Sequence, residues 1–344
     1  MPEPLKISLV GAGHMGRLHA RALVERPDVR LLAVCDTDLA AARAVAEPAG
    51  ARVTADARDA ARGADAAVLA AATAAHRDLA LALLEAGLAL LIEKPLAASA
   101  AEARDIVQAA RDRRAVVQVG HILRFDPVTR ALADRPFVPR RIEAVWRSPF
   151  TGRSTDVSVV ADMMIHPLDL VLAWTGRMPH AVRAAGRVVK GPHLDEVEAR
   201  LDFPGGCEAH LVASRVSESR ERRIRMLVRR SPPAGRAGLG EGGETDAGTV
   251  TLDYAARSAE CDGKALPVEA APDALRAQLS AFLAAVRAER PAGSQREVAV
   301  SADAGLRAVE VVERIEQAAL GSSSVQAEGL RQKSPGQRPG SKGP

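Results

Sequence analysis

Residues 5–16 read LKISLVGAGHMG, and this stretch decides the fold of the first third of the chain. Its apolar part, Lys6–Val10, predicts a buried strand. The glycines of a GxGxxG turn follow at Gly11, Gly13 and Gly16, where a helical pattern begins. In such a turn the first glycine permits the tight bend, the second lets a pyrophosphate approach the backbone, and the third lets the helix pack closely on the strand. Because a helix N-terminus also presents free N–H groups, the sequence predicts a dinucleotide-binding site.

Short apolar runs alternate with helical patterns from this turn to about residue 120. The helical spacing is clear at Ala103, Ile106, Val107 and Ala110. Further strands are predicted at Arg30–Cys35, Ala66–Ala71, Leu88–Ile92 and Ala115–Val119. Such alternation is typical of right-handed βαβ units on a parallel sheet. We therefore expect residues 1–120 to form an α/β Rossmann domain with a doubly wound sheet.

The pattern changes after residue 120, where strand-like stretches follow one another. These stretches are Ile142–Arg147, Ala181–Val189, Val197–Phe203, Cys207–Arg215 and Arg223–Arg229. Helices are predicted at Asp162–Thr175, Pro272–Arg290 and Ser301–Leu320. We expect an α+β domain over residues 121–320 with an open, mostly antiparallel sheet, whose last helix, 301–320, packs back on the first domain. Residues 231–248 are rich in Gly, Pro and Ser and predict a mobile hairpin loop, and 321–344 predict a disordered tail.

Composition narrows the class of protein. Hydrophobic residues make up 47% of the 344 residues, which is enough for a core, whereas aromatic residues make up only 2% and leave few candidates for stacking on nucleic-acid bases. The net charge of +4 comes mostly from residues 321–344, which carry four basic residues against one acidic residue, so we expect no nucleic-acid partner. No apolar run is long enough for a membrane span, and no signal-peptide pattern is present. The expected compartment is the cytoplasm.

Cysteine and histidine spacing gives no metal site. Cys35, Cys207 and Cys261 lie far apart, without a CxxC motif. The histidines outside the motifs described below share no ligand spacing, and we interpret His19 as an ordinary surface or packing residue. The basic stretch Arg215–Arg230 alternates charged with apolar residues, which indicates one solvated face of a sheet or a subunit interface. An open sheet leaves a face and edges to cover, so we expect a homodimer or homotetramer.

Asp36 ends the second predicted strand, twenty residues after Gly16. A carboxylate at this point can accept hydrogen bonds from both ribose hydroxyls of NAD and would repel a 2′-phosphate, so Asp36 favours NAD over NADP. The alternative is that Asp36 caps the helix predicted at Leu39–Ala46.

Two groups of charged residues lie where the predicted fold could bring them to a ligand. Glu93-Lys94-Pro95 follows a buried strand at the end where ligand crevices open, and Pro95 restricts Lys94 to extended geometry. Asp162 and His166 lie at i and i+4 of a predicted helix, with Asp169 near the same stripe, so a carboxylate can orient an imidazole. From the residues alone, Lys94 could equally be a surface lysine before a turn, and the helical pair could lie on a solvated face.

Taken together, GxGxxG, Asp36, the segment ATAAH at 72–76, EKP at 93–95 and DMMIH at 162–166 resemble the Gfo/Idh/MocA oxidoreductases over about residues 5–320. The resemblance implies NAD as cofactor and a catalytic set of Lys94, Asp162 and His166. It also implies the following cofactor contacts: Gly11, Gly13, His14, Met15, Gly16, Asp36, Thr73, His76, Glu93 and Lys94. Either His166 or Lys94 could be the general base, with the other group orienting or stabilising the reacting oxygen.

Two further stretches, VGHILRFDP at 119–127 and SPFTGRSTD at 148–156, resemble the UDP-N-acetylglucosamine 3-dehydrogenase branch of that family. This implies oxidation of the C3 hydroxyl of UDP-N-acetylglucosamine, a step toward lipid A precursors. Arg124 and Arg153 could contact the substrate diphosphate, or both could be solvated surface arginines. Inositol, a free hexose and a UDP-hexuronic acid stay open as substrates. A non-catalytic NAD-binding regulator is the alternative of a different class.

Overall fold

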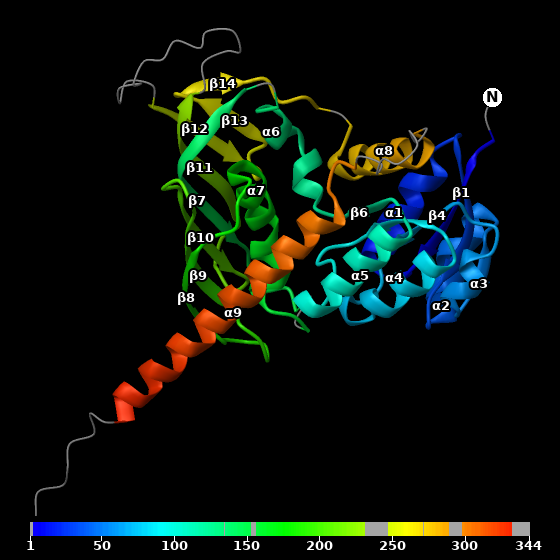
Figure 1. The fold of residues 1–344 in the computed structure, drawn as a ribbon, viewed down its shortest axis with the longest axis horizontal. Helices are drawn as coiled ribbons and strands as arrows, with labels where there is room; N and C mark the ends of the chain where they lie inside the picture. The colour runs from blue at the N-terminus through cyan, green and yellow to red at the C-terminus, as the bar shows by residue number, and fades with distance from the viewer. Residues whose placement is uncertain are drawn as a thin grey trace, which may run out of the picture.

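Two α/β layers face each other in this chain, joined by one long helix (Figure 1). The computed structural model describes residues 3–133, 135–152, 156–230, 247–270, 272–288 and 298–331. The first layer is a six-stranded parallel sheet in the order β3-β2-β1-β4-β5-β6. Its strands are β1 (Leu5–Val10), β2 (Val29–Cys35), β3 (Arg52–Thr54), β4 (Ala66–Leu69), β5 (Ala89–Ile92) and β6 (Val117–Val119). This strand order confirms the predicted Rossmann sheet.

Helices alternate with these strands along the chain. They are α1 (His14–Val24), α2 (Leu39–Ala46), α3 (Ala57–Ala61), α4 (His76–Glu85) and α5 (Ala100–Asp112), with short 3-10 turns η1 (Glu47–Ala49) and η2 (Thr73–Ala75). The sequence did not predict β3, because a three-residue strand at a sheet edge is too short to show a period. Strands β1 and β4 are buried along almost their whole length, as strands covered on both faces must be.

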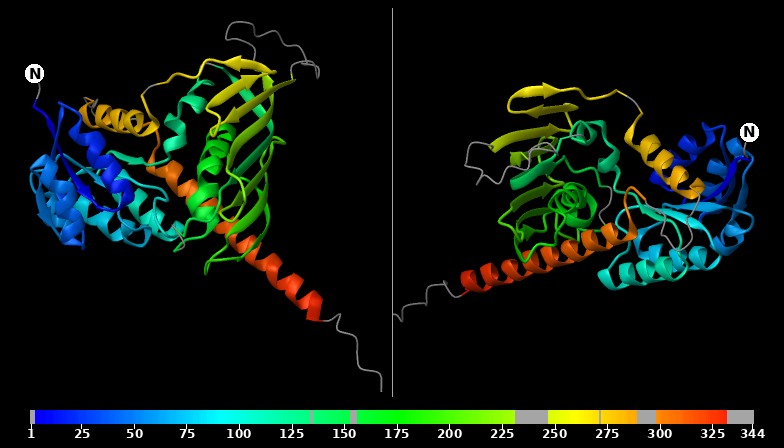
Figure 2. Two further views of the ribbon diagram at one scale, coloured as in Figure 1. Left: turned by 180° about the vertical axis from the view of Figure 1, so that it is seen from behind. Right: turned by 45° about the horizontal axis from the view of Figure 1, so that its top comes forward.

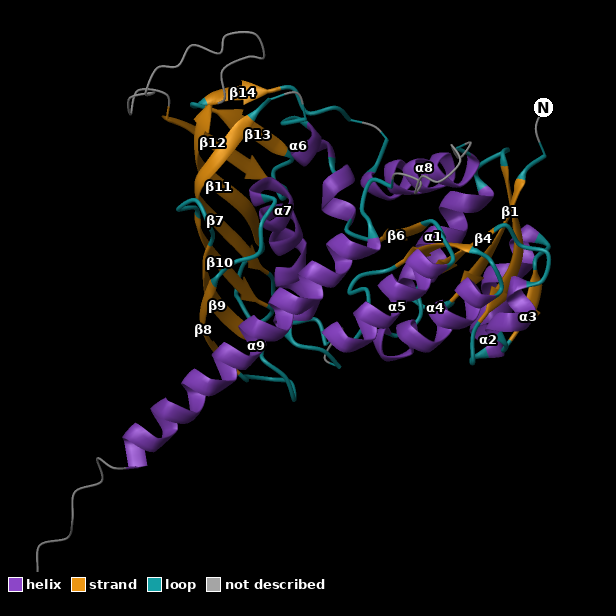
Figure 3. Ribbon diagram, viewed as in Figure 1, coloured by secondary structure: helices purple, strands orange, loops and turns teal. Residues whose placement is uncertain are grey.

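The second layer is an eight-stranded sheet in the order β14-β13-β12-β11-β7-β10-β9-β8 (Figure 3). All neighbouring pairs are antiparallel except β7 and β10, so the predicted mostly antiparallel sheet is confirmed. Its strands are β7 (Phe137–Arg147), β8 (Ala181–Arg187), β9 (Glu196–Asp202), β10 (Glu208–Ser214), β11 (Glu221–Arg230), β12 (Ala247–Asp253), β13 (Ser258–Cys261) and β14 (Lys264–Leu266). The three strands β12–β14 were not predicted.

One face of this second sheet is packed and the other is open. The packed face carries α7 (Ile165–Thr175), which is preceded by the π-helical turn η4 (Val160–Met164). The connection from the first sheet adds η3 (Ile122–Phe125) and α6 (Pro127–Arg130). Along β9, Val197, Ala199 and Leu201 are buried under α7, whereas the residues between them point outward. The helix therefore stands between the sheet and the Rossmann domain, on the side where the two layers meet (Figure 2).

Helix α8 (Ala274–Arg287) lies on the Rossmann domain, although residues 121–320 were predicted to form the second domain. Its apolar stripe, which includes Leu279 and Phe282, packs into the same core as Ile7 of β1. The reason is topological: α1 and α2 cover only part of this face of the sheet, and α8 packs beside α1 to complete the cover (Figure 1).

Helix α9 (Ala302–Arg331) connects the two layers. It packs on α5 at its start and on α7 and β8 farther along, and Ala100 donates its N–H to Glu313 of α9. The helix continues past residue 320, where the sequence predicted a disordered tail. Residues 332–344 of that tail lie outside the described residues, as do 231–246 of the predicted hairpin loop.

Candidate active site

Two of the three glycines of the turn after β1, Gly11 and Gly16, occupy positions where a side chain would not fit. Gly11 has φ +101°, and a Cβ there would stand 2.5 Å from the backbone of Ala70. A Cβ on Gly16 would stand 1.9 Å from the carbonyl oxygen of Gly11, so the helix packs directly on the turn. A Cβ on Gly13 would meet nothing within 4 Å, which leaves its side of the turn open for a ligand. The turn therefore fits a pyrophosphate at the N-terminus of α1.

Asp36 faces this turn from the end of β2. Its carboxylate accepts the N–H of Ala12 at 2.6 Å and that of Asp38 at 2.9 Å. Helix α2 is instead capped by Asp38, whose carboxylate accepts the N–H groups of Ala40 and Ala41. The alternative interpretation of Asp36 as the helix cap is therefore wrong, and its carboxylate stands beside the phosphate turn where a ribose would lie.

The other predicted cofactor contacts differ in their exposure and in what surrounds them. His14 is exposed and Met15 is half-buried at the start of α1. Thr73 lines a cavity of about 550 Å³ bounded by the loops after β4 and β5 and by α9. His76 is buried, and its ring stands 2.9 Å from the carbonyl oxygen of Pro95 and 3.1 Å from that of Ala71. His76 thus joins the loop after β5 to the loop after β4. Its contact with a cofactor stays a prediction.

Glu93 forms a buried pair with His19 of α1. His19 Nε2 lies 2.7 Å from the Glu93 carboxylate, and both side chains are almost fully buried. Burial alone would raise the pKa of the Glu93 carboxyl, but the hydrogen bond with His19 and the charge of Lys94 outweigh it and lower that pKa. The second Glu93 oxygen accepts the N–H of Lys94 at 3.2 Å. The pair therefore ties the phosphate-binding helix to the Lys94 backbone.

Lys94 reaches from the first domain to the second. Its ammonium donates to the carbonyl oxygen of Asp162 at 2.8 Å and to the Asp162 carboxylate at 3.1 Å. In a π-helical turn, the donor to the Asp162 carbonyl would be the N–H of the residue five positions further along the chain. That residue is Pro167, which has no N–H, so the carbonyl lacks this donor. The amino group of Lys94 takes the place of the missing donor. The structure thus brings together two groups that lie 68 residues apart in sequence.

His166 follows Asp162 at the start of α7. Burial and the positive charges of Lys94 and Arg222 hold the pKa of its imidazole well below the ordinary value. His166 is therefore neutral at neutral pH, which is the form that can accept a proton. Its Nδ1 is buried and has no hydrogen-bond partner among the described residues.

Behind this group lies a second buried cluster that the sequence predicted only in part. Arg124 donates two hydrogen bonds, of 2.7 and 2.8 Å, to the buried carboxylate of Asp169. His121, 1% exposed, stands 3.9 Å from the same carboxylate, and neither ring nitrogen finds a hydrogen-bond partner within the described chain. Burial lowers the pKa of His121, so its ring is neutral as well. The charge of Arg124 is already matched by Asp169, and Arg153, the other predicted substrate contact, lies outside the described residues.

Sequence reasoning missed His19 and His121 as parts of this site. His19 lies three residues after Gly16, on the α1 face that also buries Ala20 and Leu23, so helical periodicity alone could have placed it inside. His121 follows a buried strand and one glycine, and only the fold reveals that it turns toward Asp169.

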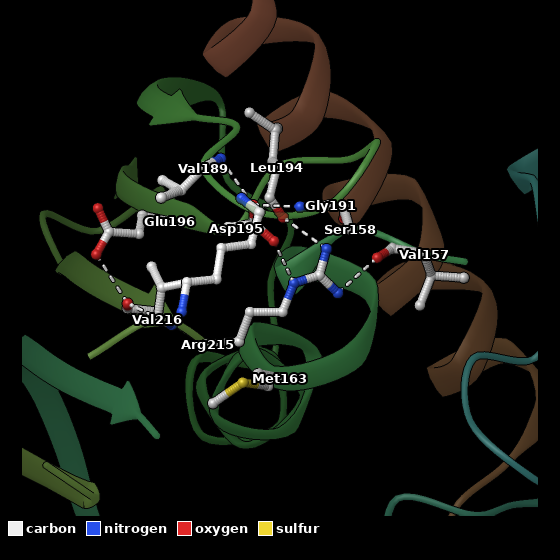
Figure 4. Close-up of polar contacts among 12 residues, drawn as sticks. Val157, Ser158, Met163, Val189, Gly191, Leu194, Asp195, Glu196, Arg215 and Val216 are labelled. Atoms are coloured by element: carbon white, nitrogen blue, oxygen red, sulfur yellow. Dashed lines mark hydrogen bonds and ion pairs between the residues drawn. The ribbon is translucent and has the colours of Figure 1, made fainter. Parts of the chain in front are cut away.

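The segment that leads into the π-helical turn is held by another buried ion pair (Figure 4). Arg215 donates to Asp195 at 2.6 Å and to the carbonyl oxygen of Val157 at 2.9 Å. Burial would raise the pKa of Asp195, but N–H groups of residues 189–191 and the Arg215 guanidinium outweigh it and lower that pKa strongly. Ser158 then accepts the N–H groups of residues 160 and 161 and donates to Glu316 of α9. These contacts fix the start of the helix that carries Asp162.

The described residues offer neither a membrane-spanning helix nor a metal-binding group. No helix there is both long and apolar enough for a membrane crossing. No group of three or more His, Cys, Asp or Glu residues there could hold a metal ion.

Comparisons with known proteins bear on this site. The oxidoreductase family with an NAD-binding Rossmann fold matches residues 5–121, and the GFO/IDH/MocA C-terminal domain matches residues 130–230. The UDP-N-acetylglucosamine 3-dehydrogenase of Acidithiobacillus ferrooxidans is 34% identical over 225 residues, which cover 65% of this chain and 71% of that protein. The inositol 2-dehydrogenase of Rhizobium meliloti is 34% identical over 232 residues, covering 61% and 69%.

Solved structures agree with the sequence comparisons. A structure of the Acidithiobacillus ferrooxidans UDP-N-acetylglucosamine 3-dehydrogenase superposes with a TM-score of 0.79 at 29% identity, covering 92% of this chain and 97% of that one. The Rossmann sheet, the GxGxxG turn and both domain matches therefore agree. The chain belongs to the Gfo/Idh/MocA family and is an NAD-dependent oxidoreductase of the sugar dehydrogenase type.

Proposed function

We propose that this protein oxidises a secondary hydroxyl of a sugar at the point where Lys94, Asp162 and His166 meet. The observation that carries the proposal is the contact between the Lys94 ammonium and Asp162, which joins the cofactor domain to the helix of His166. When bound, NAD supplies the nicotinamide that accepts the hydride. The residues that would hold it are those of the open glycine turn and Asp36.

The protonation states support a division of work between the residues. His166, whose pKa is lowered, accepts the hydroxyl proton as general base. The Lys94 ammonium donates a hydrogen bond to the substrate oxygen and stabilises the negative charge that develops there. Asp162 holds Lys94 in place. The converse assignment has Lys94 as the base and His166 as the orienting partner.

For the substrate, we propose the C3 hydroxyl of UDP-N-acetylglucosamine, and with it a role in making lipid A precursors. The similarity to the Acidithiobacillus enzyme supports this choice. The matching identity of the inositol 2-dehydrogenase makes inositol the second candidate.

Arg124 and Arg153 remain proposed diphosphate contacts, and for Arg124 this requires an exposed part of the guanidinium, since Asp169 occupies two of its donors. We further propose a cytoplasmic homodimer or homotetramer. The open face of the second sheet and the three free cysteines support this proposal.

The test is turnover of NAD by the full-length protein with UDP-N-acetylglucosamine, UDP-glucuronic acid, myo-inositol and glucose, followed at the NADH absorbance. We expect Lys94→Ala and His166→Ala each to lower kcat about a hundredfold or more, because each removes a proton-transfer or charge-stabilising group. The affinity for NAD in the His166→Ala variant should not change. Near-normal kcat in either variant would contradict the proposed site, and turnover of none of the four compounds would favour the regulator alternative.

A further inference from the structure

Strand β11 breaks its own alternation at one arginine. Arg223 and Arg225 point to the open face of the sheet, as expected of the basic stretch, and Ile224 and Met226 are buried on the packed face. Arg222 falls in the packed-face register, opposite Trp146 of β7. A cation there stands on the side of α7 and the catalytic residues, so the prediction of one solvated basic face is wrong for this residue.

The guanidinium of Arg222 is held in place by an aromatic ring. Its Cζ lies 5.8 Å from the centroid of the Trp146 ring. Trp146 is 1% exposed and packs against Tyr254, whose hydroxyl hydrogen-bonds Thr129. Stacking of this kind orients an arginine without using any of its N–H donors.

Arg222 also differs from the other cations of the site in lacking a carboxylate partner. Lys94 is paired with Asp162, and Arg124 with Asp169. Within the described chain the Arg222 side chain forms no hydrogen bond or ion pair, and its buried Nε has no hydrogen-bond partner. Burial and the charge of Arg220 lower the pKa of Arg222 while the Asp162 carboxylate raises it, and the Arg222 charge in turn helps to lower the pKa of His166. A partly buried guanidinium without a partner carries a desolvation cost that a bound anion would remove.

We propose that Arg222 binds an oxyanion carried by the substrate, a diphosphate oxygen or a sugar carboxylate, beside the Lys94–His166 site. The inference rests on the proposed function, which supplies the sugar hydroxyl that reacts. It adds the residue that selects charged over neutral sugars. A guanidinium can donate two parallel hydrogen bonds to either a phosphate or a carboxylate. Neutral polyols such as inositol would gain nothing from this contact.

Equilibrium binding tests the inference without any need for turnover. UDP, glucuronate and N-acetylglucosamine are titrated by calorimetry into the full-length protein saturated with NAD, for the wild type, Arg222→Gln and Arg222→Lys. Arg225→Gln is the matched control, because it removes the same charge from the same strand on the opposite face. We expect Arg222→Gln to weaken UDP binding about tenfold or more, Arg222→Lys to weaken it less, and Arg225→Gln to leave it unchanged.

The outcomes separate the sources of the anion and the two proposals. Weakened UDP binding assigns Arg222 to the diphosphate, and weakened glucuronate binding with unchanged UDP binding assigns it to a carboxylate. Unchanged affinity for both in a folded Arg222→Gln or Arg222→Lys variant, or failure of the wild type to bind either anion, overturns the inference, even if a neutral sugar is turned over. If no sugar is turned over but UDP binding depends on Arg222, the inference stands and the proposed function fails.

Discussion

Two buried clusters of charged and polar groups lie at opposite ends of the same π-helical turn, and they are satisfied to different degrees. In the first, the Asp195 carboxylate accepts three backbone N–H groups and the Arg215 guanidinium (Figure 4). In the second, around Lys94, the two imidazoles of His121 and His166 leave three buried ring nitrogens without partners among the described residues. Only the first cluster has a complete set of hydrogen bonds.

This difference indicates what each cluster is for. A complete set of hydrogen bonds around a buried ion pair fixes a backbone, here the segment at Val157 that leads into the helix. Buried polar atoms without partners cost free energy and persist where a ligand or a reaction needs them. The cluster around Lys94 therefore stabilises the fold less than the Asp195–Arg215 cluster, and its residues should tolerate apolar replacement better than Arg215 does.

The largest expected effect is on the satisfied cluster. Arg215→Leu leaves the Asp195 carboxylate buried and unpaired, which should lower the free energy of unfolding by about 3–5 kcal/mol. Chemical denaturation measures this, with the exposed Arg225→Leu as control. A loss below about 1 kcal/mol would mean that the backbone N–H groups alone suffice for Asp195.

The unsatisfied cluster should respond in the opposite direction. His121→Leu removes two unpartnered ring nitrogens, so we expect the free energy of unfolding to rise by about 1 kcal/mol at pH 7 while kcat falls. The gain should grow in acid. A histidine whose folded-state pKa is lowered binds its proton more readily in the unfolded chain, so its presence costs stability as the pH drops below about 6.5.

Denaturation at pH 7 and pH 5.5 checks this prediction, with the exposed His180→Leu as control. A large loss of stability in His121→Leu would show that the ring has partners in solution, such as bound water, and would remove the contrast between the two clusters.

The smallest effect concerns the serine that joins the clusters. Ser158→Ala removes the acceptor for two N–H groups at the start of the π-helical turn and should cost about 1 kcal/mol. Because Asp162 lies in that turn, kcat should fall as well. Ser99→Ala removes a comparable cap from α5 and serves as the matched control: it should lower stability alone. Equal kcat in the two variants would separate the cap from catalysis.

Particular residues show how far sequence patterns reached. Gly11, Gly13 and Gly16 could be assigned because a tight turn, an open approach and a close helix contact each require glycine locally. Helix α8 could not be assigned to the Rossmann core from the sequence. Its apolar stripe predicts that one face is buried but does not indicate which sheet covers that face. The same limit applied to Arg222, which lies in a run of charged residues and whose partner Trp146 lies on another strand.

The sequence alone determined the βαβ alternation, the dinucleotide turn and the mostly antiparallel second sheet, and its motifs singled out Lys94, Asp162 and His166 as candidates for one reacting group, because periodicity and short motifs are local properties of a chain. Tertiary structure alone decided which side chains are satisfied and which are not. It paired Arg124 with Asp169, buried His19 against Glu93, and left the ring nitrogens of His121 and the Nε of Arg222 without hydrogen-bond partners within the described chain. Burial and hydrogen-bond partners arise from contacts between segments far apart in sequence, and no local pattern encodes them.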